Sequence, residues 1–83
     1  MLEVGQIFNK DNAVFCVLDL LDYNDVHYAL FSKETEKVEY LFYEIVKVDN
    51  GYTLVEVEDD ELNFALFDLV EKEEMWWKTN IYL

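Results

Sequence analysis

An Asn-Gly pair between two segments of β character constrains the fold of this chain more than any other feature. Residues 38–48 are rich in Val, Ile, Tyr and Phe, the side chains that strands favour, and residues 52–58 continue this character after a short break. Asn50 and Gly51 lie in that break. They are typical of a type I′ turn, because both central residues of such a turn need a positive φ. The sequence therefore predicts a tight β-hairpin here.

The same turn predicts how the two strands of the hairpin pair. A two-residue loop at Asn50 and Gly51 would place Asp49 opposite Tyr52, and the other pairs follow from that one. We expect the core face of this hairpin to carry four valines: Val46, Val48, Val55 and Val57. The opposite face is mixed in character: Ile45, Lys47, Leu54 and Glu56.

Three further segments are typical of β-strands. Residues 4–8 form a short first run, and residues 26–31 form a longer one. Residues 13–21 are apolar on both alternating faces, which is typical of a strand that is covered on both sides. Polar, turn-forming or charged segments separate the predicted strands: residues 10–12, 22–25 and 32–37.

A helix is predicted over residues 60–74. Asp59 or Asp60 can cap its N-terminus, and the neighbouring acids suit the positive end of the helix dipole. The apolar residues then fall on one helical stripe: Leu62, Ala65, Leu66, Leu69 and Val70. A strand over residues 62–70 is the competing interpretation, because periodicity alone does not decide nine mostly apolar residues. The acidic lead-in and the length favour the helix.

Four aromatic residues of this region have two alternative roles. Phe64 and Phe67 lie away from the apolar stripe, so we expect two exposed rings that could contact a partner. Trp76 and Trp77 diverge by about 100° on a helix. One of them is expected to close the core, whereas the other could anchor an interface. Residues 79–83 are expected to be a last edge strand or a frayed end.

These elements together predict an α+β fold. The expected architecture is one small acidic domain over residues 1–83, in which a twisted antiparallel sheet of four or five strands packs against one C-terminal α-helix. The chain contains 53% hydrophobic and 17% aromatic residues, which is too apolar for a disordered chain despite its charge.

The charge of the chain is strongly negative. There are 19 Asp and Glu against 6 Lys and no Arg, so the formal net charge is −13. This charge repels nucleic acid, and Arg is the residue best suited to phosphate and base contacts, so direct binding of DNA or RNA is not expected. Docking on an anionic membrane needs basic clusters and is not expected either. Two interpretations of the acidity remain, a solvated surface and steering towards a basic partner.

The location is predicted to be cytoplasmic. Cys16 is the single cysteine, so no disulfide can form within the chain, which suits a reducing compartment. Residues 1–10 lack the basic start and apolar run of a signal peptide, and no apolar stretch approaches the roughly 20 residues that cross a bilayer.

No residue pattern in the chain indicates catalysis, a metal or a cofactor. His27 is the only histidine and lacks the converging ligands or nucleophile that a site needs. Cys16 lies between Phe15 and Val17 in an acidic chain, a setting typical of an inert core thiol rather than of a nucleophile. The acidic run at 56–61 could attract calcium, but its spacing is not that of a calcium loop. We therefore expect no enzyme, no cofactor and no metal site.

Two parts of the chain resemble a known family. The Val-His-Tyr-Ala-Leu-Phe strand at residues 26–31 and the strand pair and acidic run at 38–61, followed by Leu62, are similar to DUF1292, a family of short acidic bacterial proteins of unknown function. The resemblance covers residues 12–72. It implies a small cytoplasmic domain of bacterial or phage origin and assigns no mechanism. The chain departs from the family at Met75, Trp76 and Trp77, where the family usually continues in acids.

The sequence thus favours a non-enzymatic module that presents an acidic surface to a basic protein partner. Carboxylates steer association and set specificity more than they set affinity. The most specific form of this hypothesis is a DNA mimic that inhibits a nucleic-acid-binding protein. The alternatives are a homo-oligomer that packs through its aromatic surfaces and a small metal-binding or enzymatic domain. The residues expected to contact the partner are Glu56, Glu58, Asp59, Asp60, Glu61, Phe64, Phe67, Asp68, Glu71, Glu73, Glu74 and Trp77.

Overall fold

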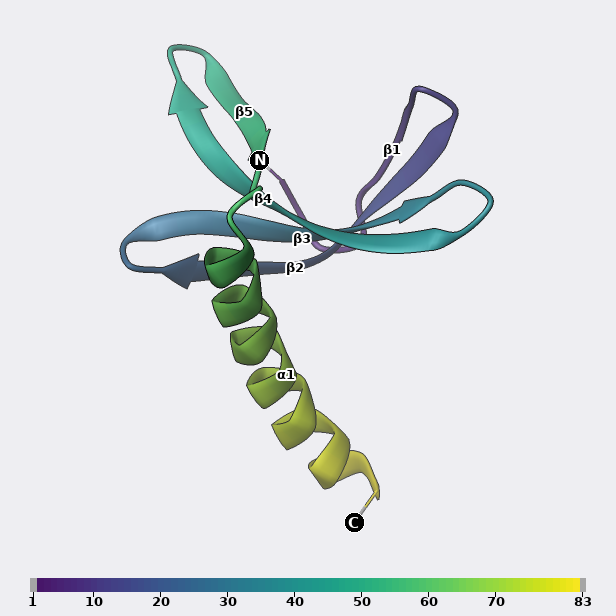
Figure 1. Cartoon of the computed structure of the whole chain (residues 1–83), viewed down its shortest axis with the longest axis vertical. Helices are drawn as coiled ribbons and strands as arrows, with labels where there is room; N and C mark the ends of the chain where they lie inside the picture. The colour runs from purple at the N-terminus through teal and green to yellow at the C-terminus, as the bar shows by residue number, and fades with distance from the viewer. Residues whose placement is uncertain (1, 83) are drawn as a thin grey trace.

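The chain forms a five-stranded antiparallel sheet and one C-terminal helix. A computed structural model describes the backbone of residues 2–82 and the side chains of residues 2–72. The strands follow one another in the sheet in chain order (Figure 1). Their bounds are β1 Ile7–Lys10, β2 Ala13–Tyr23, β3 Val26–Glu34, β4 Val38–Val48 and β5 Gly51–Glu56, and the helix is α1 Asp60–Tyr82. The predicted α+β class is confirmed, and the strand alternative for residues 62–70 is wrong.

Two of the hairpin turns use Asn and Asp in the left-handed conformation. Asp11 and Asn12 between β1 and β2 have φ of 52° and 62°, and Asn24 and Asp25 between β2 and β3 have φ of 50° and 63°. These residues tolerate positive φ better than other non-glycine residues, because their short polar side chains bond locally. Positive φ at both turn positions matches the twist of the flanking strands.

The turn between β4 and β5 lies one residue earlier than predicted. Asp49 and Asn50 form it, and Gly51 already pairs with Val48. The predicted register is therefore wrong. The predicted pairing would have set Ile45 opposite the charged Glu56, whereas the observed pairing sets Ile45 opposite Leu54. The predicted register would have paired Val46 with Val55, so an apolar pair exists in both registers. The observed one is favoured because Ile45 and Leu54 both pack against buried residues.

The predicted core face of this hairpin is wrong in part, since Val57 packs against buried residues whereas two of the other valines are exposed. Val55 is 51% exposed and Val48 is 47% exposed. Ile45 and Leu54, expected on a mixed outer face, pack against buried residues instead. The cause is the curl of the sheet, because the β4–β5 hairpin bends to the side opposite α1 and carries Ile45 and Leu54 inward (Figure 1).

Most element bounds lie close to the predicted ones. The clearest differences are at α1 and β1. The helix was expected to end at residue 74 and continues to Tyr82, so the edge strand expected at residues 79–83 is wrong. The first strand was expected over residues 4–8 and begins only at Ile7. Residues Val4 and Gly5 form a turn in which Gly5 has φ of 91°, a conformation that glycine adopts without steric cost. At its end β3 continues to Glu34, so part of the loop expected at residues 32–37 is strand.

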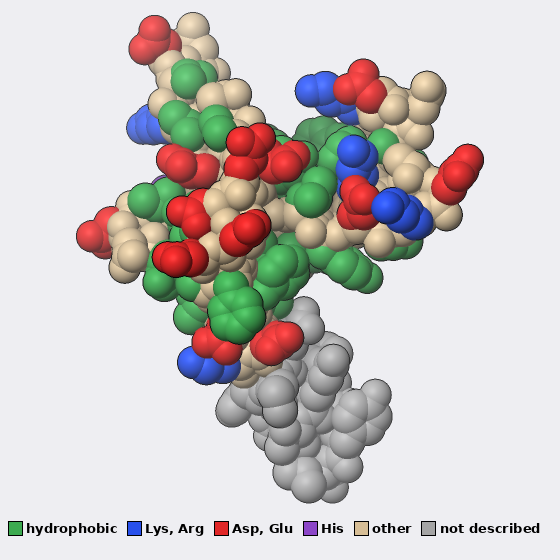
Figure 2. Space-filling view, in the orientation of Figure 1, with side chains coloured by type: hydrophobic (Ala, Val, Ile, Leu, Met, Phe, Trp, Pro, Cys, Tyr) green, Lys and Arg blue, Asp and Glu red, His purple; other side chains and the backbone are tan. Residues whose placement is uncertain are grey.

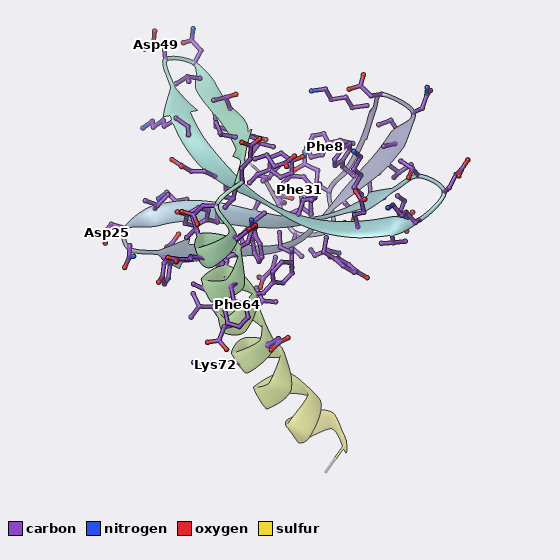
Figure 3. The ribbon with its side chains drawn as sticks, viewed as in Figure 1. Phe8, Asp25, Phe31, Asp49, Phe64 and Lys72 are labelled. Carbon is purple, nitrogen blue, oxygen red and sulfur yellow. The ribbon has the colours of Figure 1, made fainter. Side chains whose placement is uncertain are left out.

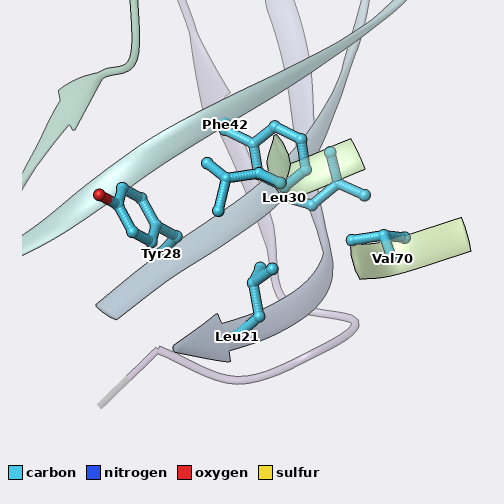
Figure 4. Packing of buried hydrophobic residues seen from close by; sticks show 6 residues of the cluster. Leu21, Tyr28, Leu30, Phe42 and Val70 are labelled. Carbon is cyan, nitrogen blue, oxygen red and sulfur yellow. The ribbon is translucent and has the colours of Figure 1, made fainter. Parts of the chain in front are cut away.

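Two apolar clusters lie on opposite faces of the sheet. The first joins the sheet to α1 and contains Leu21, Tyr28, Leu30, Phe42, Leu66 and Val70 (Figure 4). The second fills the concave face of the curled sheet and contains Leu2, Val17, Ala29 and Phe31, with Phe8, Phe15, Tyr43, Ile45, Tyr52 and Leu54 packed around them. We call these the helix cluster and the concave cluster. The predicted helical stripe is confirmed, since Leu66 and Val70 are buried.

Candidate functional site

The acidic run leads from β5 into the first turn of α1. Glu58, Asp60 and Glu61 are exposed, and in Figure 2 carboxylates gather around the start of α1, whereas the lysines of the strand hairpins lie away from it. Asp59 caps the helix, because its Oδ1 accepts hydrogen bonds from the backbone N–H groups of Glu61 (2.9 Å) and Leu62 (3.3 Å). The acids of the first turn also suit the positive end of the helix dipole.

A second interaction fixes the entry of the chain into α1. The side-chain amide of Asn63 donates to the backbone oxygens of Val57 (2.9 Å) and Asp59 (3.2 Å). Val57 itself packs against the helix cluster, and its N–H donates to the oxygen of Phe42 over 2.9 Å. The acidic run is therefore held at both of its ends by the fold.

An exposed aromatic ring lies among the carboxylates of the helix. The Phe64 side chain is 78% exposed and points away from the sheet (Figure 3). Positions three and four apart share one face of a helix, so Glu61, Phe64 and Asp68 lie together. The exposed Glu71 continues this face. We call the surface formed by Glu58, Asp60, Glu61, Phe64, Asp68 and Glu71 the acidic helix face.

One lysine lies beside the acidic helix face. Lys72 Nζ is 3.0 Å from Asp68 Oδ2, one turn along the helix. The second lysine ion pair among the described side chains joins Lys37 to Glu39 over 3.4 Å, in the β3–β4 hairpin. Glu58, Asp60 and Glu61 therefore have no lysine partner within the part of the chain whose side chains are described.

Five predicted contact residues are placed differently from expectation or lie outside the described side chains. The expectation that Phe67 is exposed is wrong, because its ring packs edge-on against Phe42 with centroids 4.6 Å apart. Glu56 lies opposite Tyr43 on the concave face, apart from the helix carboxylates. Glu73, Glu74 and Trp77 lie outside the described side chains, as does Trp76.

Glu56 also changes the chemistry of its neighbour. Burial raises the pKa of the Tyr43 hydroxyl, and the negative charge of Glu56 opposite raises it further. The pKa of Tyr28 on the other face is raised as well, first by burial and then by the charges of Glu44 and Tyr23. Both shifts favour the neutral phenol. These tyrosines contribute to packing and form no site with the acidic helix face.

Among the described side chains, no three His, Cys, Asp or Glu residues converge in a way that could hold a metal ion. His27 Nδ1 bonds Asp22 Oδ1 near the β2–β3 turn, and both side chains are exposed. The Cys16 thiol is half-buried, and its closest polar contact is the oxygen of Val17 at 3.8 Å. Neither group is joined by the further residues that nucleophilic or metal chemistry would need.

Sequence reasoning missed a cleft between the β2–β3 hairpin and the β4–β5 hairpin. Its volume is about 950 Å³. Most of the side chains that line it are apolar or aromatic: Leu2, Leu20, Leu21, Tyr28, Ile45, Tyr52 and Leu69. Four polar side chains also line it: Asp22, His27, Lys47 and Asn50. A cleft of this size and character is typical of ligand sites. No sequence signal marks it, because it depends on where two paired strands separate.

Comparison of the chain with protein-family models, with curated proteins and with solved structures gave no match. The resemblance to DUF1292 therefore stays a prediction. In the part of the chain that the structure describes, no helix is both long and apolar enough to span a membrane.

Proposed function

We propose that this chain is a protein-binding module whose acidic helix face contacts a basic surface of another protein. The observation that carries the proposal is Phe64, a ring 78% exposed on the same helix face as Glu61 and Asp68. An exposed ring surrounded by carboxylates supports a contact that has an apolar centre and a charged rim, the arrangement of many protein interfaces.

The chemistry of this face suits a lysine or arginine side chain of the partner. A cation above an aromatic ring gains about 0.5–2 kcal/mol, depending on how far it is desolvated. The surrounding carboxylates add charge pairing, and the net charge of −13 increases the rate of encounter with a basic partner. Phe64 would supply the desolvated centre of the contact and the acids its polar rim.

Affinity capture from cell lysate at low salt, followed by elution with a salt gradient, tests the proposal. The bound protein is then measured against two variants of equal charge. The first variant changes the acidic helix face: Glu58→Gln, Asp60→Asn, Glu61→Gln and Glu71→Gln. The control changes exposed acids elsewhere: Glu3→Gln, Asp11→Asn, Glu36→Gln and Asp49→Asn. Each variant removes four negative charges, so the net charge of both falls from −13 to −9.

We expect the captured protein to be lost by the first variant and kept by the control. Phe64→Ala should weaken the contact by about tenfold, as the loss of an aromatic anchor does. Affinity should also fall with added salt, because screening shortens the field of exposed charges. Equal losses in the two charge variants would contradict the proposal, because only total charge would then matter.

The DNA-mimic form of the proposal makes one additional claim. Its partner must bind nucleic acid through the same surface, so a duplex oligonucleotide should displace the captured protein from the chain. If the oligonucleotide leaves the complex intact, the mimic form is wrong, and the general proposal of a basic partner is not affected.

A homo-oligomer is the second candidate, and a different observation favours it. Ile7, Val38 and Tyr40 are exposed, and register places Ile7, Cys16, Ser32 and Tyr40 in one row across four strands. The exposed apolar side chains at the ends of this row, Ile7 and Tyr40, could pack against a second copy. Sedimentation equilibrium at rising protein concentration tests this candidate, and a constant monomer mass at high concentration would remove it.

A further inference from the structure

A fork in the sheet leaves part of one edge of β4 without a strand partner. The pairing of β3 with β4 runs from Glu34–Val38 to Tyr28–Glu44 and stops there. Beyond Glu44, β4 continues to Val48 and pairs only with β5. Figure 1 shows the β2–β3 and β4–β5 hairpins diverging from this point. A free strand edge is a template for hydrogen bonding to another extended chain.

The free edge borders the cleft between the two hairpins. Ile45 and Lys47 belong to this edge of β4, and both line the cleft. Leu20 and Tyr52 line it from the neighbouring strands. The cleft therefore combines unpaired backbone groups with apolar walls, the two features by which proteins bind a peptide as an added strand.

Charge at the mouth of the cleft is arranged asymmetrically. Asp22 lies on the wall formed by the β2–β3 hairpin, where its Oδ1 bonds His27 Nδ1 and the carboxylate stays largely exposed, and Lys47 lies on the opposite wall. The rest of the chain is strongly acidic. A basic side chain is therefore favoured on the Asp22 wall and disfavoured beside Lys47.

We propose that this cleft binds an extended peptide segment, in which a short apolar run is followed by a lysine or arginine. The segment adds as a strand to the free edge of β4, its apolar side chains cover Leu20 and Tyr52, and its basic residue pairs with Asp22. The free edge from Ile45 to Val48 is about 13 Å long at roughly 3.3 Å per residue, so it pairs with a run of about four residues. This site is separate from the acidic helix face and does not depend on it.

Selection from a displayed library of random nonapeptides, with the whole chain as bait, tests the proposal. We expect the enriched peptides to share an apolar run next to Lys or Arg. Fluorescence anisotropy then gives the affinity of one labelled, enriched peptide for the chain and for its variants. Enrichment of no common pattern, or of acidic peptides, would overturn the proposal.

Two leucines of β2 provide a matched pair of variants. Leu20 lines the cleft and is 38% exposed, whereas Leu18 is 39% exposed and does not line it. Leu20→Lys should lower the affinity for the selected peptide by about tenfold or more, because it puts a charge against an apolar ligand. Leu18→Lys and Phe64→Ala should leave the affinity within about twofold, since neither residue is at the site. Equal effects of the two leucine variants would contradict the proposal.

N-methylation of the selected peptide tests strand addition itself. A strand uses every second N–H to bond one neighbour, so methyl groups on one alternate set of amides should abolish binding and those on the other set should be tolerated. A peptide that is insensitive to both sets would bind without joining the sheet, and that result would overturn the proposal. Equal losses of the captured protein in the two charge variants, with this peptide still bound to the cleft, would reject the proposed function and leave the cleft proposal intact.

Discussion

The two faces of the sheet are covered in different ways. On one face a single helix supplies Leu66 and Val70 against Leu30 and Phe42. On the other face no helix is present among the described residues, and the sheet covers itself by curling around Phe31. Four aromatic rings meet there, with Phe31 centroids 6.4 Å from Phe8, 6.4 Å from Phe15 and 5.1 Å from Tyr43.

Because of this difference, the concave cluster mainly stabilises the fold, whereas the helix also carries exposed side chains. The concave cluster is closed by strands and the segment that carries Leu2, so it leaves little apolar surface for a partner apart from the fork. The helix cluster uses only one side of α1, which leaves the side with Phe64 open to solvent. An amphipathic helix on an otherwise finished sheet can therefore present a binding surface without disturbing the core.

Removal of the central ring of either cluster should give the largest effect. Phe42 and Phe31 are both almost fully buried, and Phe→Ala at such positions costs about 3–5 kcal/mol. A domain of this size has little more free energy of unfolding than that. We expect both variants to be largely unfolded in urea titrations followed by circular dichroism. A loss below about 1 kcal/mol at either residue would show that its cluster does not hold the fold.

Two neighbouring helix positions should then differ sharply. Leu66→Ala should lower the free energy of unfolding by about 2–5 kcal/mol, because the side chain is fully buried. Phe64→Ala should change it by less than about 0.5 kcal/mol, because the ring is exposed. Thermal unfolding of the two variants measures the contrast. A large loss at Phe64 would mean that the ring packs within the chain, which would remove the main support for the proposed function.

Alternation and capping signals predicted the elements well, because both are local. The acidic lead-in and the stripe through Leu66 and Val70 are enough to predict α1, and Asp59 caps it as expected. The register of the last hairpin was beyond such reasoning. Asn50 could occupy the first or second turn position, and the contact between Ile45 and Leu54 across the strands decides between them.

The burial of particular side chains was also hard to predict, because it depends on contacts between strands and not on local signals. Both alternating faces of β4 carry apolar residues, so only the curl of the sheet determines that Ile45 is inside and Val48 is outside. Phe67 lies next to the helical stripe, and a ring that large reaches Phe42 from the side of the helix. The acidic helix face was predicted in part, whereas the fork at Glu44 depends on long-range geometry that no local pattern encodes.

The helix cap should contribute less than either cluster. Asp59→Ala removes the acceptor for two backbone N–H groups and should cost about 1 kcal/mol. Asp60→Ala is the matched control, because no capping bond to its side chain is present among the described residues. Urea titration distinguishes the two variants. If they lose equal stability, the effect belongs to the helix dipole rather than to the cap.

The smallest change in the free energy of unfolding should appear at alkaline pH, and it involves one tyrosine on each face of the sheet. Burial is the first cause of the raised pKa of both Tyr28, on the helix side, and Tyr43, on the concave side. The folded chain then holds each phenolic proton more tightly than the unfolded chain does. The contribution of the two tyrosines to the free energy of unfolding is therefore complete below the unfolded pKa of about 10, and it is lost as pH rises through the higher folded pKa.

The variants Tyr28→Phe and Tyr43→Phe isolate the two contributions, since each removes one ionisable group and keeps its ring. Each variant should lose less stability than the parent chain between about pH 9 and pH 11, because the unfolded phenol titrates near 10. The change should have the same sign for both variants, because burial is the first cause of the raised pKa at each tyrosine. A parent chain whose unfolding free energy rises over this interval would contradict the sign.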